Sequence, residues 1–359
     1  MSSVVVGMSG GVDSSVAAAL LKEQGHRVTG VFMKIWDGEN VPVPVKRHAC
    51  YGPDEAEDIE DARAVARVLG VDFHVFDLRQ EYQAEVLDYF RHEYRSGRTP
   101  NPCLRCNHRI KFAALLNRAR ASGIEFDYFA TGHYARIGYD KERRRYLLKK
   151  AVDPAKDQSY FLSFLSQEQL AESLFPVGGY TKAEVRQLAT DYALPVHRKP
   201  ESQDFVAGDY ISMVGTALPG PLLDKSNNIL GEHRGIANYT IGQRKGLGVA
   251  TGQPLYVTDI DSERNAVIVG GREELYQDEL VAVGLNWIAF EKLEGPLEVG
   301  ARIRRGAAEA VALVTPVTED RVYVKFCQPQ LAITPGQAVV FYRGDVMLGS
   351  GTIEKKRVE

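Results

Sequence analysis

Short apolar runs alternate with amphipathic stretches along residues 1–204 of the chain. The apolar runs predict strands at Val4–Val6, His26–Phe32, Val71–Phe76 and Phe126–Thr131. Apolar positions at helical spacing predict helices at Ser14–Gln24, Asp58–Leu69, Tyr82–Tyr94 and Ile110–Ala121. This alternation predicts an α/β domain with a parallel sheet and helices on both of its faces.

The pattern changes near Gly208, where glycine, proline and turn residues become dense. Short alternating runs then predict the antiparallel strands of a small β-barrel, at Leu297–Ile303, Val311–Val314, Arg321–Cys327 and Ala338–Tyr342. We therefore expect three domains: residues 1–204, a small central domain at 205–277, and a C-terminal barrel at 278–359.

Composition narrows the class of protein. The 359 residues are 44% hydrophobic, which is enough apolar side chain for large cores and argues against disorder. Lys plus Arg number 44 and Asp plus Glu 47, a net charge of −3, so any nucleic acid must bind a local basic face. Four cysteines are too few for a disulfide framework.

No apolar run is long enough to cross a membrane, and Met1–Val6 leads straight into a strand-like run without a basic leader. We therefore expect a cytoplasmic protein with no membrane partner.

The segment Ser9–Ser15, Ser-Gly-Gly-Val-Asp-Ser-Ser, follows the first strand and opens a helix. Its glycine pair lets the backbone approach an anion, and the helix N-terminus adds N–H groups and partial positive charge. A tight turn that needs only glycine geometry is the alternative interpretation. The segment resembles the loop of the PP-loop ATP pyrophosphatase superfamily. That resemblance implies cleavage of ATP between its α- and β-phosphates and adenylation of a carbonyl oxygen, with Mg2+ sharing the charge of the pyrophosphate.

A second motif runs from Arg98 to Asn107 and contains Cys103 and Cys106 as Cys-x-x-Cys. Its two prolines predict a rigid loop before the helix at Ile110–Ala121. Neighbouring cations and a helix N-terminus are expected to lower the pKa of these thiols. Such a pair can chelate a metal, form a disulfide or relay sulfur; two buried small residues are the alternative.

Four further blocks accompany these motifs in chain order: Thr131–Tyr134, Lys156–Tyr160, Tyr239–Gly248 and Thr334–Gln337. Together with Gly7–Ser15 and Arg98–Asn107 they resemble the tRNA-specific 2-thiouridylase family over essentially the whole chain. The resemblance implies that O2 of the wobble uridine of a tRNA is adenylated by ATP, and that sulfur from a cysteine desulfurase, a carrier or free sulfide displaces AMP.

The resemblance also assigns roles to residues of this chain. It implies that ATP is held by Gly7, Met8, Ser9, Gly10, Gly11, Val12, Asp13, Ser14, Met33 and Gly132. The implied catalytic residues are Asp13, Cys103 and Cys106, and those contacting the target base are Asn101, Pro102 and Cys103. The implied tRNA contacts are His133, Lys156, Asp157, Gln158, Arg304, Arg305 and Gln337, with residues 278–359 as a tRNA-binding domain.

Several of these residues also have simpler interpretations. Met33 can pack in a core, His133 can cap a loop, and Arg304 and Arg305 can form a solvated strand edge. Basic residues at Arg143–Arg145 suggest a nucleic-acid contact, although they fall in a predicted hairpin turn.

The chain departs from the family at Val206, where we expect a second catalytic cysteine in Ser-x-x-Ile-Cys-Phe. Two hypotheses compensate for its absence. Cys50, Cys103 and Cys106 converge as ligands of a [4Fe–4S] cluster, or a persulfide on Cys106 is resolved by Cys103 or Cys50. Cys327 lies in an alternating strand, and we expect it to be a buried structural thiol.

Two rival functions remain at this stage. One is another PP-loop adenylating enzyme, such as an amidotransferase-type synthetase or a lysidine synthetase, which explains neither the Cys-x-x-Cys motif nor the barrel. The other is a non-catalytic tRNA-binding or sulfur-carrier protein, against which the intact Ser9–Ser15 loop argues.

Overall fold

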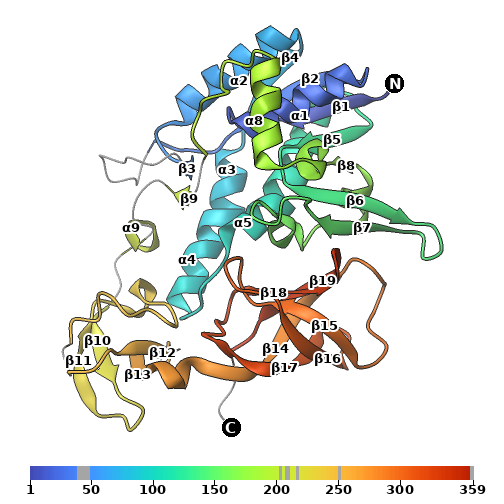
Figure 1. The fold of residues 1–359 in the computed structure, drawn as a ribbon. Helices are drawn as coiled ribbons and strands as arrows, with labels where there is room; N and C mark the ends of the chain where they lie inside the picture. The colour runs from blue at the N-terminus through green and yellow to red at the C-terminus, as the bar shows by residue number, and fades with distance from the viewer. Residues whose placement is uncertain (39–48, 202–203, 207–210, 216–217, 250–251, 356–359) are drawn as a thin grey trace. The chain divides into compact units, whose positions relative to one another are not determined.

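The computed structural model describes residues 1–38, 49–201, 204–206, 211–215, 218–249 and 252–355 (Figure 1). The chain divides into two compact units. The first contains Met1–Val86, Pro102–Asp209 and Asp345–Met347, and the second contains Leu87–Asn101, Tyr210–Gly344 and Leu348–Glu359. Within the described residues, no helix has the length and apolar character needed to span a membrane.

A five-stranded parallel sheet organises the first unit, in the order β4-β2-β1-β5-β8. Its strands are β1 (Ser3–Gly7), β2 (Arg27–Lys34), β4 (Asp72–Asp77), β5 (Tyr128–Thr131) and β8 (Ser173–Leu174). The chain builds β2 and β4 on one side of β1 and then returns to add β5 on the other side. The strand order therefore reverses between β1 and β5, and ligands of open parallel sheets bind at the carboxyl ends of strands beside such a point.

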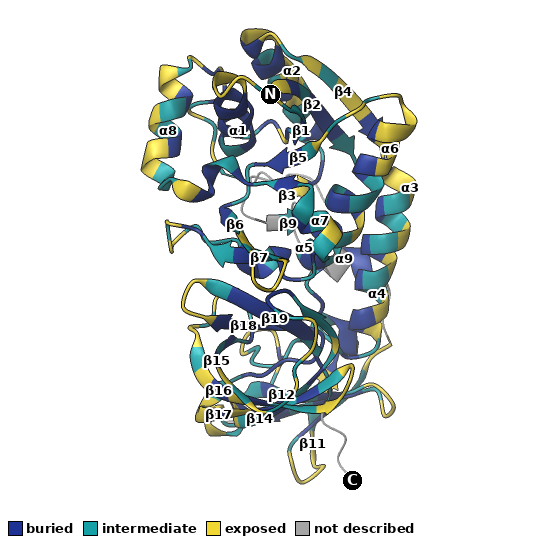
Figure 2. Cartoon of the chain, turned by 90° about the vertical axis from the view of Figure 1, so that its right-hand side faces the viewer, coloured by how far each residue is buried: buried dark blue, intermediate teal, exposed yellow. Residues whose placement is uncertain are grey.

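Helices α1 (Val12–Glu23), α2 (Glu55–Leu69) and α8 (Lys182–Asp191) flank this sheet, and local signals explain their ends. Gly70 terminates α2 in a left-handed conformation with φ of 60°. Thr181 starts α8 with a capping box that includes Glu184. Buried and exposed residues occupy opposite faces of both α2 and α8 (Figure 2). The shorter helices of the unit are α3 (Arg79–Tyr82), α5 (Pro102–Arg105), α6 (Leu115–Ala121) and α7 (Gln167–Ala171).

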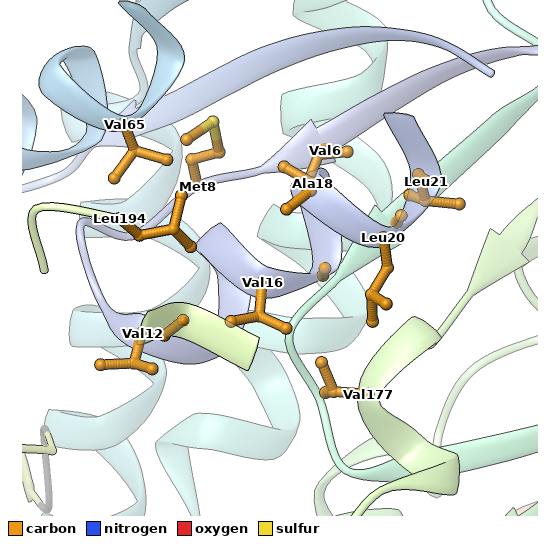
Figure 3. Close-up of a cluster of buried hydrophobic side chains, with 14 of the residues drawn as sticks. Val6, Met8, Val12, Val16, Ala18, Leu20, Leu21, Val65, Val177 and Leu194 are labelled. Carbon is orange, nitrogen blue, oxygen red and sulfur yellow. The ribbon is translucent and has the colours of Figure 1, made fainter. Parts of the chain in front are cut away.

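One hydrophobic core joins β1, α1, α2 and α8 (Figure 3). Val6 on β1, Val16 on α1 and Val65 on α2 are fully buried in it. Val185 and Ala189 contribute the inner face of α8. Because α1 lies between sheet and helices, the loop that precedes it is held on a rigid support.

The first unit also contains two smaller strand pairs. Strands β6 (Ala135–Asp140) and β7 (Arg145–Lys150) form an antiparallel hairpin, which confirms the predicted turn at Arg143–Arg145. Strands β3 (Ala49–Tyr51) and β9 (Asp204–Val206) pair in parallel, with Tyr51 opposite Val206. The short segments Ser159–Leu162 and Pro176–Gly179 are 3-10 helical.

The second unit contains helices α4 (Asp88–Arg95) and α9 (Ile211–Val214) and two β-structures. A four-stranded sheet has the order β11-β10-β13-β12, with β10 (Gly220–Leu223), β11 (Ile229–His233), β12 (Tyr256–Asp261) and β13 (Ala266–Gly270). Strands β14 to β19 form a closed barrel, because β19 pairs back onto β14. Their bounds are β14 (Tyr276–Trp287), β15 (Leu297–Arg302), β16 (Ala310–Thr318), β17 (Arg321–Leu331), β18 (Ala338–Arg343) and β19 (Val346–Ile353). Segments Ile236–Asn238 and Arg272–Leu275 are 3-10 helical.

The structure confirms the α/β sheet, the barrel and most predicted elements, with two corrections. Cys327 on β17 is exposed rather than buried, because Val322, Val324 and Phe326 occupy the inward positions of the two-residue repeat. The predicted rigid loop around Cys103 is helical instead. Pro102 occupies the first position of α5, where proline is well tolerated. The predicted domain boundaries near 205 and 277 stay predictions.

The core around α1 predicts the effect of truncating one of its side chains. Leu20 is 4% exposed, so Leu20→Ala leaves a cavity in the core. The substitution should lower the free energy of unfolding by about 2–5 kcal/mol. Val68→Ala on the 53%-exposed face of α2 is the control and should change it by less than about 0.5 kcal/mol. Urea denaturation followed by circular dichroism measures both, and equal effects would contradict the described core.

Candidate functional site

The loops after β1 and β5 lie side by side at the reversal of strand order. Gly7 is the register partner of Thr131, so the chain segments that follow these residues leave the sheet together. A Cβ atom on Gly132 would lie 2.5 Å from the amide nitrogen of Ser14 and 2.6 Å from the carbonyl carbon of Asp13. Only glycine permits this approach, since both neighbours are backbone atoms at the start of α1.

The Ser9–Ser15 segment has the geometry of an anion cradle. Gly10 has φ of +71°, and a Cβ there would lie 2.4 Å from the carbonyl oxygen of Asp58. Gly11 is the N-cap of α1 and supplies no side-chain cap, so its helix N-terminus keeps N–H groups for a ligand. The hydroxyls of Ser14 and Ser15 donate to the Gly11 carbonyl at 3.3 and 2.7 Å and fix the turn. This arrangement fits the pyrophosphate moiety of ATP.

Three other residues expected to hold ATP, Met8, Val12 and Met33, differ in how deeply they are buried. Met8 is 1% exposed, belongs to the hydrophobic core, and donates its backbone N–H to Val31 at 2.8 Å. Val12 is likewise buried in the core. Met33 is half-buried near the end of β2, opposite Phe76 on β4. Met8 and Val12 thus shape the loop from below through packing.

Asp13 stands at the centre of a polar network that sequence reasoning missed. Its Oδ1 accepts hydrogen bonds from the Tyr134 hydroxyl at 2.8 Å and from Lys182 Nζ at 2.6 Å. Lys182 also pairs with Glu201 at 3.1 Å. Burial, followed by the charge of Asp13, raises the pKa of Tyr134, which keeps its hydroxyl a donor. No local pattern identifies these partners, because they lie 121 and 169 residues from Asp13.

The carboxylate of Asp13 is a ligand type that suits Mg2+. This cation is usually held by one or two carboxylates together with substrate phosphates. Asp13 supplies one such carboxylate beside the anion cradle. Over the described part of the chain, no group of three or more His, Cys, Asp or Glu side chains is arranged to hold a metal ion by itself.

Cys106 is buried at the start of a π-helical segment, Cys106–Ala114, that continues from α5. Burial raises the pKa of its thiol to about 11; Lys111 lowers the pKa in part, while Cys50 adds to the rise. The expected lowering of this pKa is therefore wrong for Cys106. Desolvation outweighs the nearby cation, because a thiolate is costly inside the protein.

The other cations of the motif do not act on this thiol. Arg105 is paired with Glu85, donating to its carboxylate at 2.8 Å. Burial, with the charges of Arg109 and Arg105, lowers the pKa of His108 to about 4, so this imidazole is neutral at pH 7. Arg109 is exposed. The positive residues of the motif therefore differ in whether they change the pKa of the Cys106 thiol.

Lys111 is the cation that responds to the thiols. Burial opposes its charge, but the thiols of Cys106, Cys50 and Cys103 together raise the pKa of its ammonium above the usual value. The i to i+5 hydrogen-bond pattern of a π-helix brings residues five apart closer to one face than an α-helix does. Cys106 and Lys111 have this separation within the segment.

The three candidate cluster ligands differ in environment. Cys50 is exposed on β3, Cys103 is half-buried on α5, and Cys106 is buried. None of the chain's four cysteines forms a disulfide. Among the described residues, these three thiols do not form a group arranged to hold a metal ion.

Comparisons with known proteins cover all parts of the chain. Family models described as "tRNA methyl transferase HUP domain", "tRNA methyl transferase PRC-barrel domain" and "Aminomethyltransferase beta-barrel domain" match residues 2–207, 208–271 and 277–353. A "tRNA-specific 2-thiouridylase MnmA" of Moorella thermoacetica is 51% identical over 98% of this chain and 99% of its own length. The relative of the same name from Desulforamulus reducens is 50% identical over 98% of this chain and 97% of its own. The chain belongs to the tRNA-specific 2-thiouridylase family.

The tRNA contacts expected in the first unit of this 2-thiouridylase family member differ in availability. Lys156 is partly exposed and pairs with Glu201 at 2.7 Å. Asp157 accepts backbone hydrogen bonds from Ala151 and Ser159, and Gln158 accepts one from the Tyr134 N–H. The hydrogen bonds of Asp157 and Gln158 hold their own loop in shape. Lys156 is therefore the one of these three residues that presents a positive charge for a phosphate.

His133 lies in an aromatic environment. Its Nδ1 is 2.7 Å from the Thr131 hydroxyl, and its ring lies 6.1 Å from the rings of Phe112 and Phe175. Burial, with the charge of Lys111, holds its pKa well below the ordinary value. A neutral, packed imidazole of this kind supports the loop after β5.

In the second unit, three blocks typical of the 2-thiouridylase family meet at Thr99 and Pro100, just before Asn101. Gln337 Nε2 donates to the carbonyls of Thr99 and Pro100 at 2.8 and 3.3 Å. The Thr99 hydroxyl contacts that of Thr240 at 3.2 Å. Gln337 therefore fixes the segment from which Asn101 is expected to reach the target base. Pro102 follows in the first unit and is buried, while Arg304 and Arg305 lie in the turn after β15.

The contact at Gly132 predicts a loss of nucleotide binding on substitution. Gly132→Ala forces apart two backbone segments and should weaken binding of an ATP analogue by about tenfold or more, as 1–3 kcal/mol of strain implies. Gly179→Ala, where a Cβ meets no atom within 4 Å, is the control. Isothermal titration calorimetry measures both. Unchanged affinity in Gly132→Ala would show that the loop contact does not shape the site.

The pKa of Cys106 predicts its reactivity toward alkylating reagents. Because the folded-state pKa is raised to about 11, the thiol is protonated at pH 7, and its alkylation rate should rise about tenfold per pH unit from pH 7 to 10 without a plateau. Lys111→Met should slow this reaction at every pH, and Lys111→Arg should restore it. Mass spectrometry of the Cys106 peptide measures the rates, with exposed Cys327 as internal reference. A plateau below pH 9 would contradict the buried, neutral thiol.

Proposed function

We propose that this protein is a tRNA-uridine 2-sulfurtransferase that replaces O2 of the wobble uridine with sulfur at the expense of ATP. The observation that carries the proposal is sequence identity. Over 98% of the chain, relatives named tRNA-specific 2-thiouridylase are 51% and 50% identical to it. The intact Ser9–Ser15 cradle and the buried Cys106 supply the two chemical requirements of that reaction.

The first step is adenylation of the uridine. A carbonyl oxygen is a poor leaving group, and transfer of AMP to O2 makes its displacement feasible. The bond between the α-phosphorus and the α,β-bridging oxygen breaks, and pyrophosphate leaves with that electron pair. The N–H groups at the start of α1 hold the departing anion, and Asp13 would help to hold Mg2+, which would supply further positive charge to it.

The second step brings sulfur to C2. The terminal sulfur of a Cys106 persulfide, loaded by a cysteine desulfurase or a carrier, attacks C2, and AMP leaves with the former O2. The product is then joined to Cys106 through a disulfide bond. A second thiol attacks Cys106 Sγ, which releases 2-thiouridine and leaves a protein disulfide that an external dithiol reduces. Free sulfide in place of the persulfide would displace AMP directly and form no disulfide.

The chain offers Cys50 as the second thiol. Position 206, where the family resemblance places a cysteine, carries valine and lies on β9, which pairs directly with β3. Cys50 is the residue before Tyr51, the register partner of Val206. Its exposure suits a resolving thiol, and negative charge on it would raise the pKa of Cys106. Cys103, three residues before Cys106, is the alternative.

The test is thiolation of a wobble-uridine tRNA by the full-length protein with ATP, Mg2+ and a persulfide donor. Mass spectrometry of the digested tRNA separates replacement of oxygen by sulfur from addition of a methyl group. Wild type should form 2-thiouridine with AMP and pyrophosphate. Cys106→Ser should abolish the product from the persulfide donor. Cys50→Ser should lower it at least about tenfold with that donor but spare the reaction with free sulfide.

Cys327→Ser is the matched control, since this thiol is exposed like Cys50 and lies on β17 of the second unit; it should keep full activity. AMP release without thiolation by any donor would indicate another adenylating enzyme. No tRNA-dependent AMP release at all would indicate a binding protein. Activity confined to iron-loaded protein, with iron lost in Cys50→Ala, would replace the persulfide route by a cluster.

A further inference from the structure

Lys182 places a buried cation beside the nucleotide loop. Its side chain is 11% exposed, and its Nζ lies 2.6 Å from Asp13 Oδ1 and 3.1 Å from Glu201 Oε1. The same ammonium lies 5.8 Å from the centre of the Tyr134 ring. The Ser9–Ser15 segment contains no lysine or arginine of its own. The positive side chain that pairs with Asp13 in this segment therefore comes from a distant part of the chain.

The fold holds Lys182 on a rigid element. It is the first residue of α8, whose start is fixed by the Thr181–Glu184 capping box. Its backbone N–H donates to Asp153 Oδ2 at 3.0 Å. Val185 and Ala189, further along α8, share the core with Val16 of α1. The start of α8 is thus fixed by its packing against α1. The ammonium group can still move, because the four-carbon side chain of Lys182 can change rotamer.

Opposite charges surround Lys182 in the ligand-free protein, and Arg186 also lies 4.0 Å from Glu201. Asp13 and Glu201 are two carboxylates, and Lys182 and Lys156 are the two ammonium groups paired with them. Burial works to raise the pKa of Glu201, but hydrogen bonds from Lys156 and Lys182 lower it. A triphosphate that enters beside Asp13 adds negative charge, which the half-buried carboxylate opposes unless a cation separates them. If Asp13 binds Mg2+ in place of Lys182, the ammonium of Lys182 can bind the phosphates.

We propose that Lys182 is a phosphate-binding residue of the nucleotide site, held by Asp13 and Glu201 before ATP binds and turned to the β- and γ-phosphates when it does. The inference deepens the proposed function, because it rests on ATP being a substrate. After adenylation the same ammonium neutralises pyrophosphate. Glu201 then acts as the competitor that Lys182 leaves on binding and returns to on release.

A purely structural role predicts a different pattern of mutant effects. If the ion pairs only hold the loop in shape, then removing either Lys182 or Glu201 should weaken nucleotide binding. If Lys182 binds phosphate, then Lys182→Met should weaken it, whereas Glu201→Gln removes a competing anion and should leave binding equal or tighter. The two variants therefore separate the roles by the sign of the effect.

The experiment measures Kd by calorimetry for the full-length protein with Mg2+ and α,β-methylene ATP, pyrophosphate or AMP, without tRNA. Lys182→Met should weaken the ATP analogue and pyrophosphate about 10- to 100-fold, the range of a lost charge-assisted hydrogen bond, and change AMP by less than about threefold. Lys182→Arg should recover most of the affinity, because it keeps the charge. Circular dichroism and thermal melting verify that each variant is folded.

Lys199→Met is the matched control. Lys199 is also 11% exposed and bridges two carboxylates, Asp58 and Asp61, yet it pairs with no residue of the loop. It should bind the analogue within about twofold of wild type. Weakening by Glu201→Gln to the same degree as by Lys182→Met, or an equal loss for AMP, would overturn the inference. Failure of wild type to bind the analogue at all would instead overturn the proposed use of ATP.

Discussion

The contact between the backbone at Gly132 and the start of α1 is the constraint on which the first unit depends. It brings the end of β5 within van der Waals distance of Asp13 and Ser14, at the point where the strand order reverses. The neighbours that the chain after β5 supplies to the loop follow from that contact. Tyr134, two residues after Gly132, reaches Asp13, and the loop containing Gln158 is fixed to the Tyr134 backbone. A larger residue at 132 would separate these groups, because its side chain would meet backbone atoms of Asp13 and Ser14, which cannot rotate away.

Burial sets the chemistry of the sulfur site in a way that the charged motif does not suggest. A protonated thiol at Cys106 is protected from random oxidation and metal capture until a partner or substrate alters its surroundings. Lys111 lowers the pKa of this thiol in part, and its ammonium would in turn be stabilised by the thiolate once that forms. If Cys106 carries sulfur as proposed, the protein keeps it as a neutral thiol, and Lys111 is the counter-ion of its thiolate.

The sequence predicted the elements whose determinants are local. Helix α2 ends at Gly70 because a left-handed residue is needed there, and β17 alternates because one face lines the barrel. The same local signals misjudged Cys327, which occupies the outward position of that alternation. They also misjudged Cys103, because Pro102 can begin a helix as readily as rigidify a loop. The glycine-rich cradle was visible from its spacing, whereas Lys182 and Glu201 were not. Ion pairs across 169 residues depend on how α8 packs against α1, and no window of sequence contains that information.

The Asp13–Lys182–Glu201–Lys156 chain links the two anions that the proposed reaction must bring together. Lys182 lies at the nucleotide end and Lys156 at the end expected to meet tRNA, and Glu201 accepts from both. In the proposed complex, a tRNA phosphate that withdrew Lys156 would leave Glu201, among the described residues, with Lys182 and Arg186 as cationic partners, the latter at 4.0 Å. The carboxylate then holds Lys182 more firmly unless a triphosphate competes for it. Electrostatic logic therefore favours nucleotide binding before tRNA, since Lys182 is most easily transferred while Lys156 still neutralises Glu201.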